Sequence, residues 1–274
     1  MNYDGLNMFI IDGIAVNYKV SGPQSSNAGA PWVTLVTGIA NDYTMWDAQM
    51  PALEPHFRVL RYDLRGQGGT QATKPPYTIA QLVHDLARLW DKLGIRKTHL
   101  VGLGLGGGIV QAAAVQHGER LISLMPVCCR AKMVPDFAAM WHGLIAKVEK
   151  EGVESIIEQT AQRWFSDEFK AKNPQVLDSV RAMIRRTSLD GYLGCVHAFL
   201  GMDVEKDLEK IRVPTHYLSG ADDKLGGPPA LMAGLAAKVP GAQHASVPDA
   251  AHIANIQNPA GFNAAMVGFL KEHS

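Results

Sequence analysis

The sequence has no excess of charge of either sign and no long hydrophobic run. Its 274 residues include 26 Lys and Arg and 26 Asp and Glu, so the formal net charge is zero. Proteins that bind nucleic acid or anionic membranes usually carry a basic surface, and that feature is missing here. No apolar run approaches the length of a membrane-spanning helix. We therefore expect neither nucleic acid nor a membrane as a partner.

Cysteine is scarce as well, with only Cys128, Cys129 and Cys195 in the chain. Adjacent cysteines do not pair easily with each other, and no C-x-x-C spacing offers a metal or redox site. The amino terminus lacks the basic region followed by an apolar run that marks a secretory signal. These observations predict reduced, buried thiols in a cytoplasmic protein that uses no metal and no cofactor.

Glycine, by contrast, is concentrated in one stretch. A short apolar strand around residues 99–101 runs into a glycine-dense turn, residues 102–108, which is followed by an alanine-rich helix. A tight strand-to-helix turn of this kind serves one of two chemistries. It either presents a nucleophile at the carboxyl edge of a parallel sheet or lets a phosphate group approach the bare backbone.

Two sequence templates overlap in this turn. The residues fit the dinucleotide pattern G-x-G-x-x-G and equally the nucleophile pattern G-x-S-x-G, with Gly104 in the place of serine. Dinucleotide binding needs an acidic residue about twenty positions on, and the next apolar run, residues 121–129, supplies none. Arg130 could still meet a 2′-phosphate, so this alternative stays open. A turn that only packs a helix on a strand is a third interpretation.

Strand and helix patterns alternate along the rest of the chain, which predicts an α/β fold with a doubly wound, mostly parallel sheet. The segment 131–208 differs, since helical patterns follow one another there without a convincing strand. We predict a core made of residues 1–130 and 209–274. Residues 131–208 are predicted to form a helical lid, inserted before the strand that carries a candidate acid.

Three predicted strands end in residues of chemical interest, in the order Gly104, Asp222-Asp223 and His252. Tyr62-Asp-Leu-Arg-Gly-Gln-Gly68, Gly220-Ala-Asp-Asp223, and Ala251-His252 followed by Asn258-Pro259 are similar to motifs of the α/β-hydrolase fold family. The chain resembles in particular its 3-oxoadipate enol-lactonase branch. This resemblance implies a catalytic acid at Asp223 and a catalytic histidine at His252.

By the same resemblance, the backbone N–H groups of Ile39 and Leu105 form an oxyanion hole. The family's serine is absent, however, and Gly104 cannot form an acyl-enzyme. One hypothesis is therefore an enzyme that acts on a small carbonyl or lactone compound through a His252–Asp223 general base. A non-catalytic receptor for small molecules, and a hydrolase whose serine was replaced by design, are the alternatives. Thr37 and the cysteine pair at 128 and 129 are weaker substitutes for the nucleophile.

The segment 131–208 and the strand end before it also contain candidate substrate-binding residues. Aromatic and basic side chains there could line a pocket, although packing between helices explains the aromatic ones equally well. We expect a small molecule as the partner of this pocket and leave homo-oligomer formation open. The candidates are Arg130, Trp141, Trp164, Tyr192 and His197, with Arg163 as a further cation.

Overall fold

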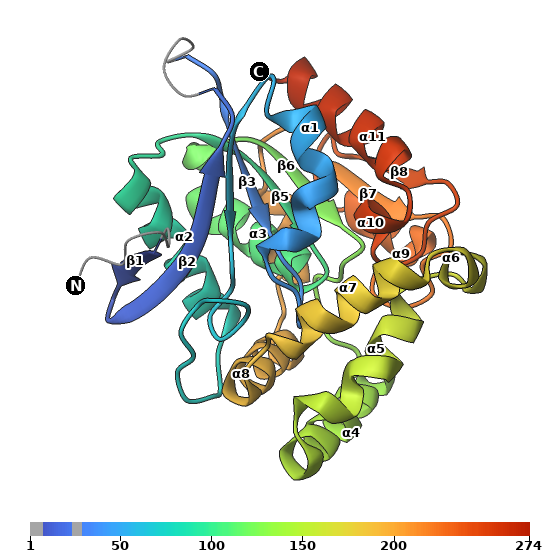
Figure 1. Cartoon of the computed structure of the whole chain (residues 1–274). Helices are drawn as coiled ribbons and strands as arrows, with labels where there is room; N and C mark the ends of the chain where they lie inside the picture. The colour runs from blue at the N-terminus through green and yellow to red at the C-terminus, as the bar shows by residue number, and fades with distance from the viewer. Residues whose placement is uncertain (1–7, 24–28) are drawn as a thin grey trace.

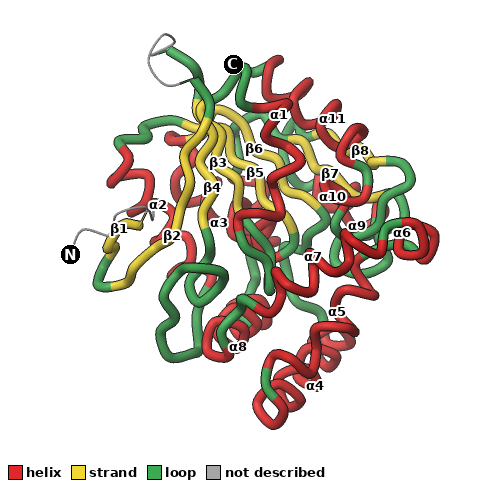
Figure 2. Tube along the Cα trace, in the orientation of Figure 1, coloured by secondary structure: helices red, strands yellow, loops and turns green. Residues whose placement is uncertain are grey.

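The computed structural model describes residues 8–23 and 29–274, which form one eight-stranded sheet flanked by helices (Figures 1 and 2). The strand order is β1-β2-β4-β3-β5-β6-β7-β8; β1 and β2 are antiparallel, and the strands from β3 to β8 run parallel. The strands are β1 (Met8–Ile11), β2 (Ile14–Ser21), β3 (Trp32–Val36), β4 (Arg58–Tyr62), β5 (Thr98–Leu103), β6 (Leu121–Val127), β7 (His216–Gly220) and β8 (Gln243–Val247).

Helices cover both faces of the sheet, with α1 and α11 in front of it and α3 behind it in Figure 1. The predicted doubly wound α/β fold is thus confirmed. The helices outside the segment 131–208 are α1 (Met50–Leu53), α2 (Ile79–Leu93), α3 (Leu105–His117), α9 (Pro229–Ala236), α10 (Ala254–Gln257) and α11 (Pro259–Glu272), with the 3-10 helices η1 (Tyr43–Gln49) and η2 (Gly118–Arg120).

The helix α2 shows how local sequence fixes an element's ends. Its first turn is capped by Thr78, whose hydroxyl accepts a hydrogen bond from the Gln81 N–H at 3.1 Å. It stops at Gly94, which adopts the left-handed conformation with φ 66°. Between these caps one face is buried and includes Leu82, Leu86 and other apolar residues. The capping threonine, the amphipathic stretch and the closing glycine thus account for both ends of this helix.

Between β6 and β7 the structure contains helices in succession. They are α4 (Pro135–Glu151), η3 (Val153–Ile156), α5 (Ile157–Trp164), α6 (Asp167–Lys172), α7 (Pro174–Arg185), α8 (Leu189–Leu200) and η4 (Glu205–Lys210). Helix α6 has only six residues, which are too few to show an amphipathic period in the sequence. Its start is capped by the Ser166 hydroxyl, which accepts a hydrogen bond from the Phe169 N–H. Within residues 8–23 and 29–274, no helix combines the length and the apolar character that crossing a membrane requires.

Candidate active site

The turn between β5 and α3 holds Gly104 in an unusual backbone conformation. Its φ is 61° and its ψ is −119°, a region that favours glycine. The Gly104 N–H donates to the carbonyl oxygen of Val127 on the neighbouring strand at 3.0 Å. The turn therefore has the sharp strand-to-helix shape of a nucleophile elbow, and the shape does not depend on a side chain at its tip.

The glycines of this turn have different roles. A Cβ added at Gly102 would lie 2.4 Å from the carbonyl oxygen of Gly106, and one at Gly106 would lie 2.5 Å from that of Val36. Both positions therefore need glycine so that α3 can pack closely on the sheet. At Gly104 the nearest atoms to an added Cβ would be Cα of Gly38 and Nε2 of His252, each at 3.8 Å. Space for a small side chain exists there, directly in front of the histidine.

The loop after β7 holds the acid of the site. Asp223 accepts hydrogen bonds from the backbone N–H groups of Leu225 (2.7 Å), Gly226 (3.2 Å) and Gly227 (2.9 Å). Burial opposes ionisation of this carboxyl. The charge and hydrogen bond of His252, with the N–H groups of Leu225 and Gly227, outweigh burial and hold the pKa of Asp223 below its ordinary value. Asp223 is therefore a buried carboxylate, whereas its neighbour Asp222 is exposed.

The loop after β8 brings His252 against this carboxylate. Nδ1 of the ring lies 3.0 Å from Oδ2 of Asp223, and the side chain is 11% exposed. Asp223, as an acceptor, fixes the proton on Nδ1 and leaves Nε2 free to take a proton on the cavity side. The ring packs on Gly226, where an added Cβ would lie only 2.2 Å from Cε1. The acid and the histidine expected from the sequence are thus brought together.

The substitute nucleophiles considered in the sequence do not fit the site. The sulfur of Cys128 and the ligand atoms of Asp223 and His252 lie within 4.8 Å of one another, but this sulfur accepts from the Gly220 N–H at 3.2 Å. Burial and the charge of Asp223 raise the pKa of the thiols of Cys128 and Cys129. A protonated thiol is a poor nucleophile. The Thr37 hydroxyl is buried and does not line the cavity.

The expected oxyanion-hole residues both line the cavity beside Gly104. Leu105 is the first residue of α3, where a backbone N–H has no partner within the helix. Ile39 follows Gly38 in the loop after β3, so it approaches the turn from the other side. Within the part of the chain that the structure describes, neither N–H has a hydrogen-bond acceptor. Both donors are therefore free to meet an oxygen atom of a ligand.

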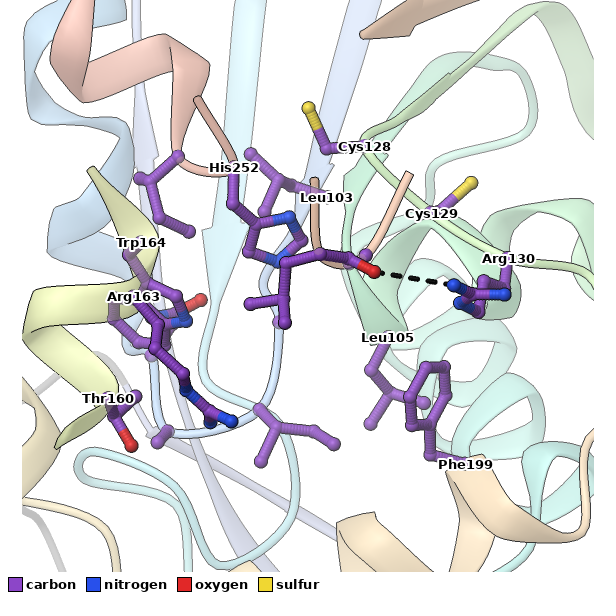
Figure 3. Close-up of a pocket in the computed structure, with 18 of the residues that line it drawn as sticks. Leu103, Leu105, Cys128, Cys129, Arg130, Thr160, Arg163, Trp164, Phe199 and His252 are labelled. Carbon is purple, nitrogen blue, oxygen red and sulfur yellow. Dashed lines mark hydrogen bonds between the residues drawn. The ribbon is translucent and has the colours of Figure 1, made fainter. Parts of the chain in front are cut away.

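Side chains from the helical segment also line the cavity in front of His252, among them Thr160, Arg163 and Trp164 (Figure 3). Phe137, Trp141 and Phe199 form a triangle of rings with centroid distances of 5.5 to 6.2 Å, all edge to face. Trp164 and Tyr192 are buried and line the cavity as well. The aromatic candidates thus serve both interpretations, since they pack between helices and face the cavity.

The two arginine candidates line the cavity, and the histidine candidate does not. Arg130 and Arg163 are labelled in Figure 3, on either side of His252. His197 is not among the lining residues, so the structure does not bring this candidate to the cavity. In α8 it lies two positions from Phe199, which is about 200° around a helix, and it therefore faces away from the cavity.

Several lining residues were missed in the sequence, among them Asn41, Phe137, Thr160, Phe199, Leu225, Gly226 and Ile253. Spacing could have revealed the aromatic ones, because Phe137 and Trp141 are four positions apart and Tyr192 and Phe199 are seven apart on their helices. The loop residues carry no such period. Their placement depends on how the loops meet at the sheet edge.

Comparison with known proteins agrees with this geometry. Residues 31–259 match the family model of the alpha/beta hydrolase fold. The 3-oxoadipate enol-lactonase 1 of Acinetobacter baylyi is 27% identical over 264 residues, which cover 94% of each chain. The crystal structure of the enol-lactonase from Burkholderia xenovorans LB400 superposes with a TM-score of 0.91 at 32% identity, covering 96% of this chain and 99% of that one. A hydrolase from Pseudomonas aeruginosa PA01 gives the same score and identity.

The chain therefore belongs to the α/β-hydrolase fold family, and it is an enzyme that resembles the enol-lactonase branch. The family match favours the nucleophile-elbow interpretation of the glycine turn over dinucleotide binding. Fold and family do not determine the reaction by themselves. The chemistry of this chain has to be derived from the residues at its own site, where Gly104 stands at the tip of the turn.

Proposed function

We propose that this enzyme acts on a small carbonyl or lactone substrate without a covalent enzyme intermediate. One observation supports the proposal above all others. Gly104 keeps the elbow geometry but leaves the space 3.8 Å from Nε2 of His252 without a side chain, while the His252–Asp223 pair is complete. That space suits a water molecule or the reacting part of a substrate. His252 would then act directly on it as a general base.

In the hydrolytic form of this proposal, Nε2 of His252 takes one proton from a water molecule. The resulting hydroxide forms a bond to the carbonyl carbon, and the carbonyl oxygen becomes an oxyanion that accepts from the N–H groups of Ile39 and Leu105. When this intermediate collapses, the bond to the leaving oxygen breaks. That oxygen receives the proton from His252, and Asp223 stabilises the imidazolium in between.

The same groups support a second reaction type. If the substrate places a C–H bond next to its carbonyl within reach of Nε2, His252 removes that proton and the carbonyl oxygen becomes an enolate. The backbone donors that would bind an oxyanion serve an enolate equally well. Lyase or isomerase chemistry on a small carbonyl compound is therefore the alternative to hydrolysis, favoured by the absence of a nucleophilic oxygen at Gly104.

We also propose that the helical segment 131–208 acts as a lid on this site, since Trp141 and Tyr192 contact the cavity from it. We further propose a cytoplasmic location, since the three cysteines are free and buried.

The direct test is His252→Ala, assayed beside the parent on small esters, enol-lactones and ketones. Loss of the general base is expected to lower turnover by about 10² to 10⁴-fold. His142→Ala is the matched control, because His142 lies exposed on α4 and does not line the cavity. Turnover at the parental rate in His252→Ala would contradict the proposal.

A further inference from the structure

The cavity contains two cationic side chains from different elements. Arg130 follows β6, and Arg163 belongs to α5 in the helical segment. Figure 3 shows both side chains reaching toward the cavity, with His252 between them. Neither residue is needed for the general-base chemistry proposed above. Their presence beside the catalytic histidine therefore requires an explanation of its own.

Neither arginine has a carboxylate partner in the described part of the chain. Nη2 of Arg130 donates to the Leu225 carbonyl at 3.3 Å, and its guanidinium lies 4.0 Å from the centroid of the Phe137 ring. Nη1 of Arg163 donates to the sulfur of Met140, at 3.3 Å. In both residues Nε is buried and has no hydrogen-bond partner. Strong donors thus remain unused on both sides of His252.

Burial lowers the pKa of both arginines, and the groups that oppose this effect are few. The charge of Asp223 partly offsets burial at Arg130, but that carboxylate is already paired with His252. Among residues 8–23 and 29–274, no carboxylate pairs with Arg163, and Tyr192 opposes the effect of burial on its pKa. A partly buried cation without an anion is costly, so a ligand that supplies the anion gains binding energy at both positions.

The rest of the cavity lining also offers hydrogen-bond donors and no acidic side chain among the described residues. Nε1 of Trp141 and Nδ2 of Asn41 are buried donors that have no partner among the described residues, and both residues line the cavity. The described residues that line it include no Asp or Glu. A ligand that fits this set of donors must be rich in acceptor oxygens and negatively charged.

We propose that the substrate is a small dicarboxylate, with one carboxylate on Arg130, the other on Arg163, and the reacting carbonyl between them in front of His252. This inference rests on the proposed function, because it takes the same cavity as the active site. It extends that proposal by assigning two carboxylates to the substrate, which the general-base reaction on a lactone or ester does not require. Arg forms paired, charge-assisted hydrogen bonds with carboxylates, which makes the two positions selective as well as attractive.

The test is isothermal titration calorimetry of the parent at neutral pH with succinate, glutarate and adipate, each beside its monomethyl ester. At least one diacid is expected to bind about 10 to 100-fold more tightly than its monoester, which corresponds to one charge-assisted interaction. Arg130→Gln and Arg163→Gln should each reduce diacid affinity to the level of the monoester. Arg96→Gln, an exposed arginine outside the cavity, is the matched control and should bind like the parent.

Two results would overturn the inference: equal affinity for diacid and monoester across the series, or diacid binding that survives both cavity substitutions. Titration of His252→Ala separates this inference from the proposed function. If that variant still prefers diacids while its turnover equals the parent's, the dicarboxylate site stands and the general-base role fails. If turnover is lost but the variant does not prefer diacids, the general-base role stands and the dicarboxylate site fails.

Discussion

Two parts of the same sheet edge differ in what they supply to the site. The turn after β5 has the backbone of a nucleophile elbow but no side chain at Gly104. The loops after β7 and β8 supply a complete pair, with Nδ1 of His252 3.0 Å from the Asp223 carboxylate and three backbone N–H groups on that carboxylate. The site therefore has the groups that transfer a proton, but it lacks the side chain that would form a covalent bond to the substrate.

This difference shows which features of an α/β-hydrolase site are built into the backbone. The positive φ of Gly104 and the free N–H groups of Ile39 and Leu105 do not depend on a serine. Glycine even adopts that conformation with less strain than serine would. Without the serine, the backbone of such a site keeps its shape, but covalent catalysis at this position is no longer available. Proton transfer and stabilisation of an oxyanion do not require the serine.

The largest effect is expected where the complete pair is broken. Asp223→Asn replaces an acceptor for the His252 Nδ1 proton by an amide whose NH₂ group can only donate. The ring then adopts the wrong tautomer, and turnover should fall by about 10² to 10⁴-fold, as in His252→Ala. Steady-state kinetics measure the loss. Asp222→Asn, one position away in an exposed site, is the control and should keep parental turnover.

The opposite experiment supplies what the turn lacks. Gly104→Ser places an oxygen in the free space beside Nε2 of His252. Hydrolysis of aryl esters should rise by at least about 10²-fold with an initial burst, although by less than the roughly 10⁶-fold that a mature serine protease gains from its nucleophile. Stopped-flow detection of the phenolate measures the burst. A variant without esterase activity would show that Ile39, Leu105 and His252 are not aligned for acyl transfer.

Protonation of His99, near the start of β5, is expected to lower the stability of the fold independently of the active site at the other end of that strand. His99 is buried, its Nδ1 lies 2.7 Å from the Ser123 hydroxyl, and burial and the charge of His273 lower its pKa to about 4. Because the folded pKa lies below the ordinary value near 6.5, the neutral ring stabilises the fold above about pH 6.5. That contribution, about 3 kcal/mol at most by linkage, is lost as the pH falls from 6.5 to 4.

His99→Gln should therefore show a smaller loss of unfolding free energy over this pH range than the parent, measured by urea denaturation. The difference between the two proteins removes the effect of other groups, such as Asp63, whose pKa burial raises to about 6. His56→Gln, at an exposed position, should follow the parent. Identical pH profiles for His99→Gln and the parent would contradict the assignment.

The smallest effect compares two glycines of the same turn. Gly104→Ala meets free space and has only its positive φ to overcome, so the free energy of unfolding should fall by about 1 to 2 kcal/mol. Gly106→Ala places a Cβ 2.5 Å from the Val36 carbonyl and should cost about 3 kcal/mol. Denaturation curves give both values. Equal losses of unfolding free energy in the two variants would contradict the tighter packing assigned to Gly106.

Much of the fold could be predicted because its signals are local. Alternation of strands with helices predicted the parallel sheet, and capping residues with an amphipathic pattern mark both ends of α2. The order of β3 and β4 in the sheet has no such signal, since it depends on contacts between distant segments. Helix α6 escaped prediction because it spans less than two turns.

The site was predictable where residues follow strand ends. Asp223 and His252 both do, and parallel strands place such residues at one edge. The residues of the cavity wall were harder to predict, and the candidate His197 lies outside the lining. Which face of α8 meets the site depends on how that helix packs on the core, and the mostly apolar sequence of α8 has no polar face to indicate it.

The central claim is that this enzyme works through His252 without forming a covalent bond to its substrate. The most direct measurement is intact-protein mass spectrometry after treatment with a fluorophosphonate, which labels activated serine nucleophiles. We predict that the parent keeps its mass and that Gly104→Ser gains one phosphonate group. Stoichiometric labelling of the parent, abolished by His252→Ala, would reveal another nucleophile at the site and contradict the account.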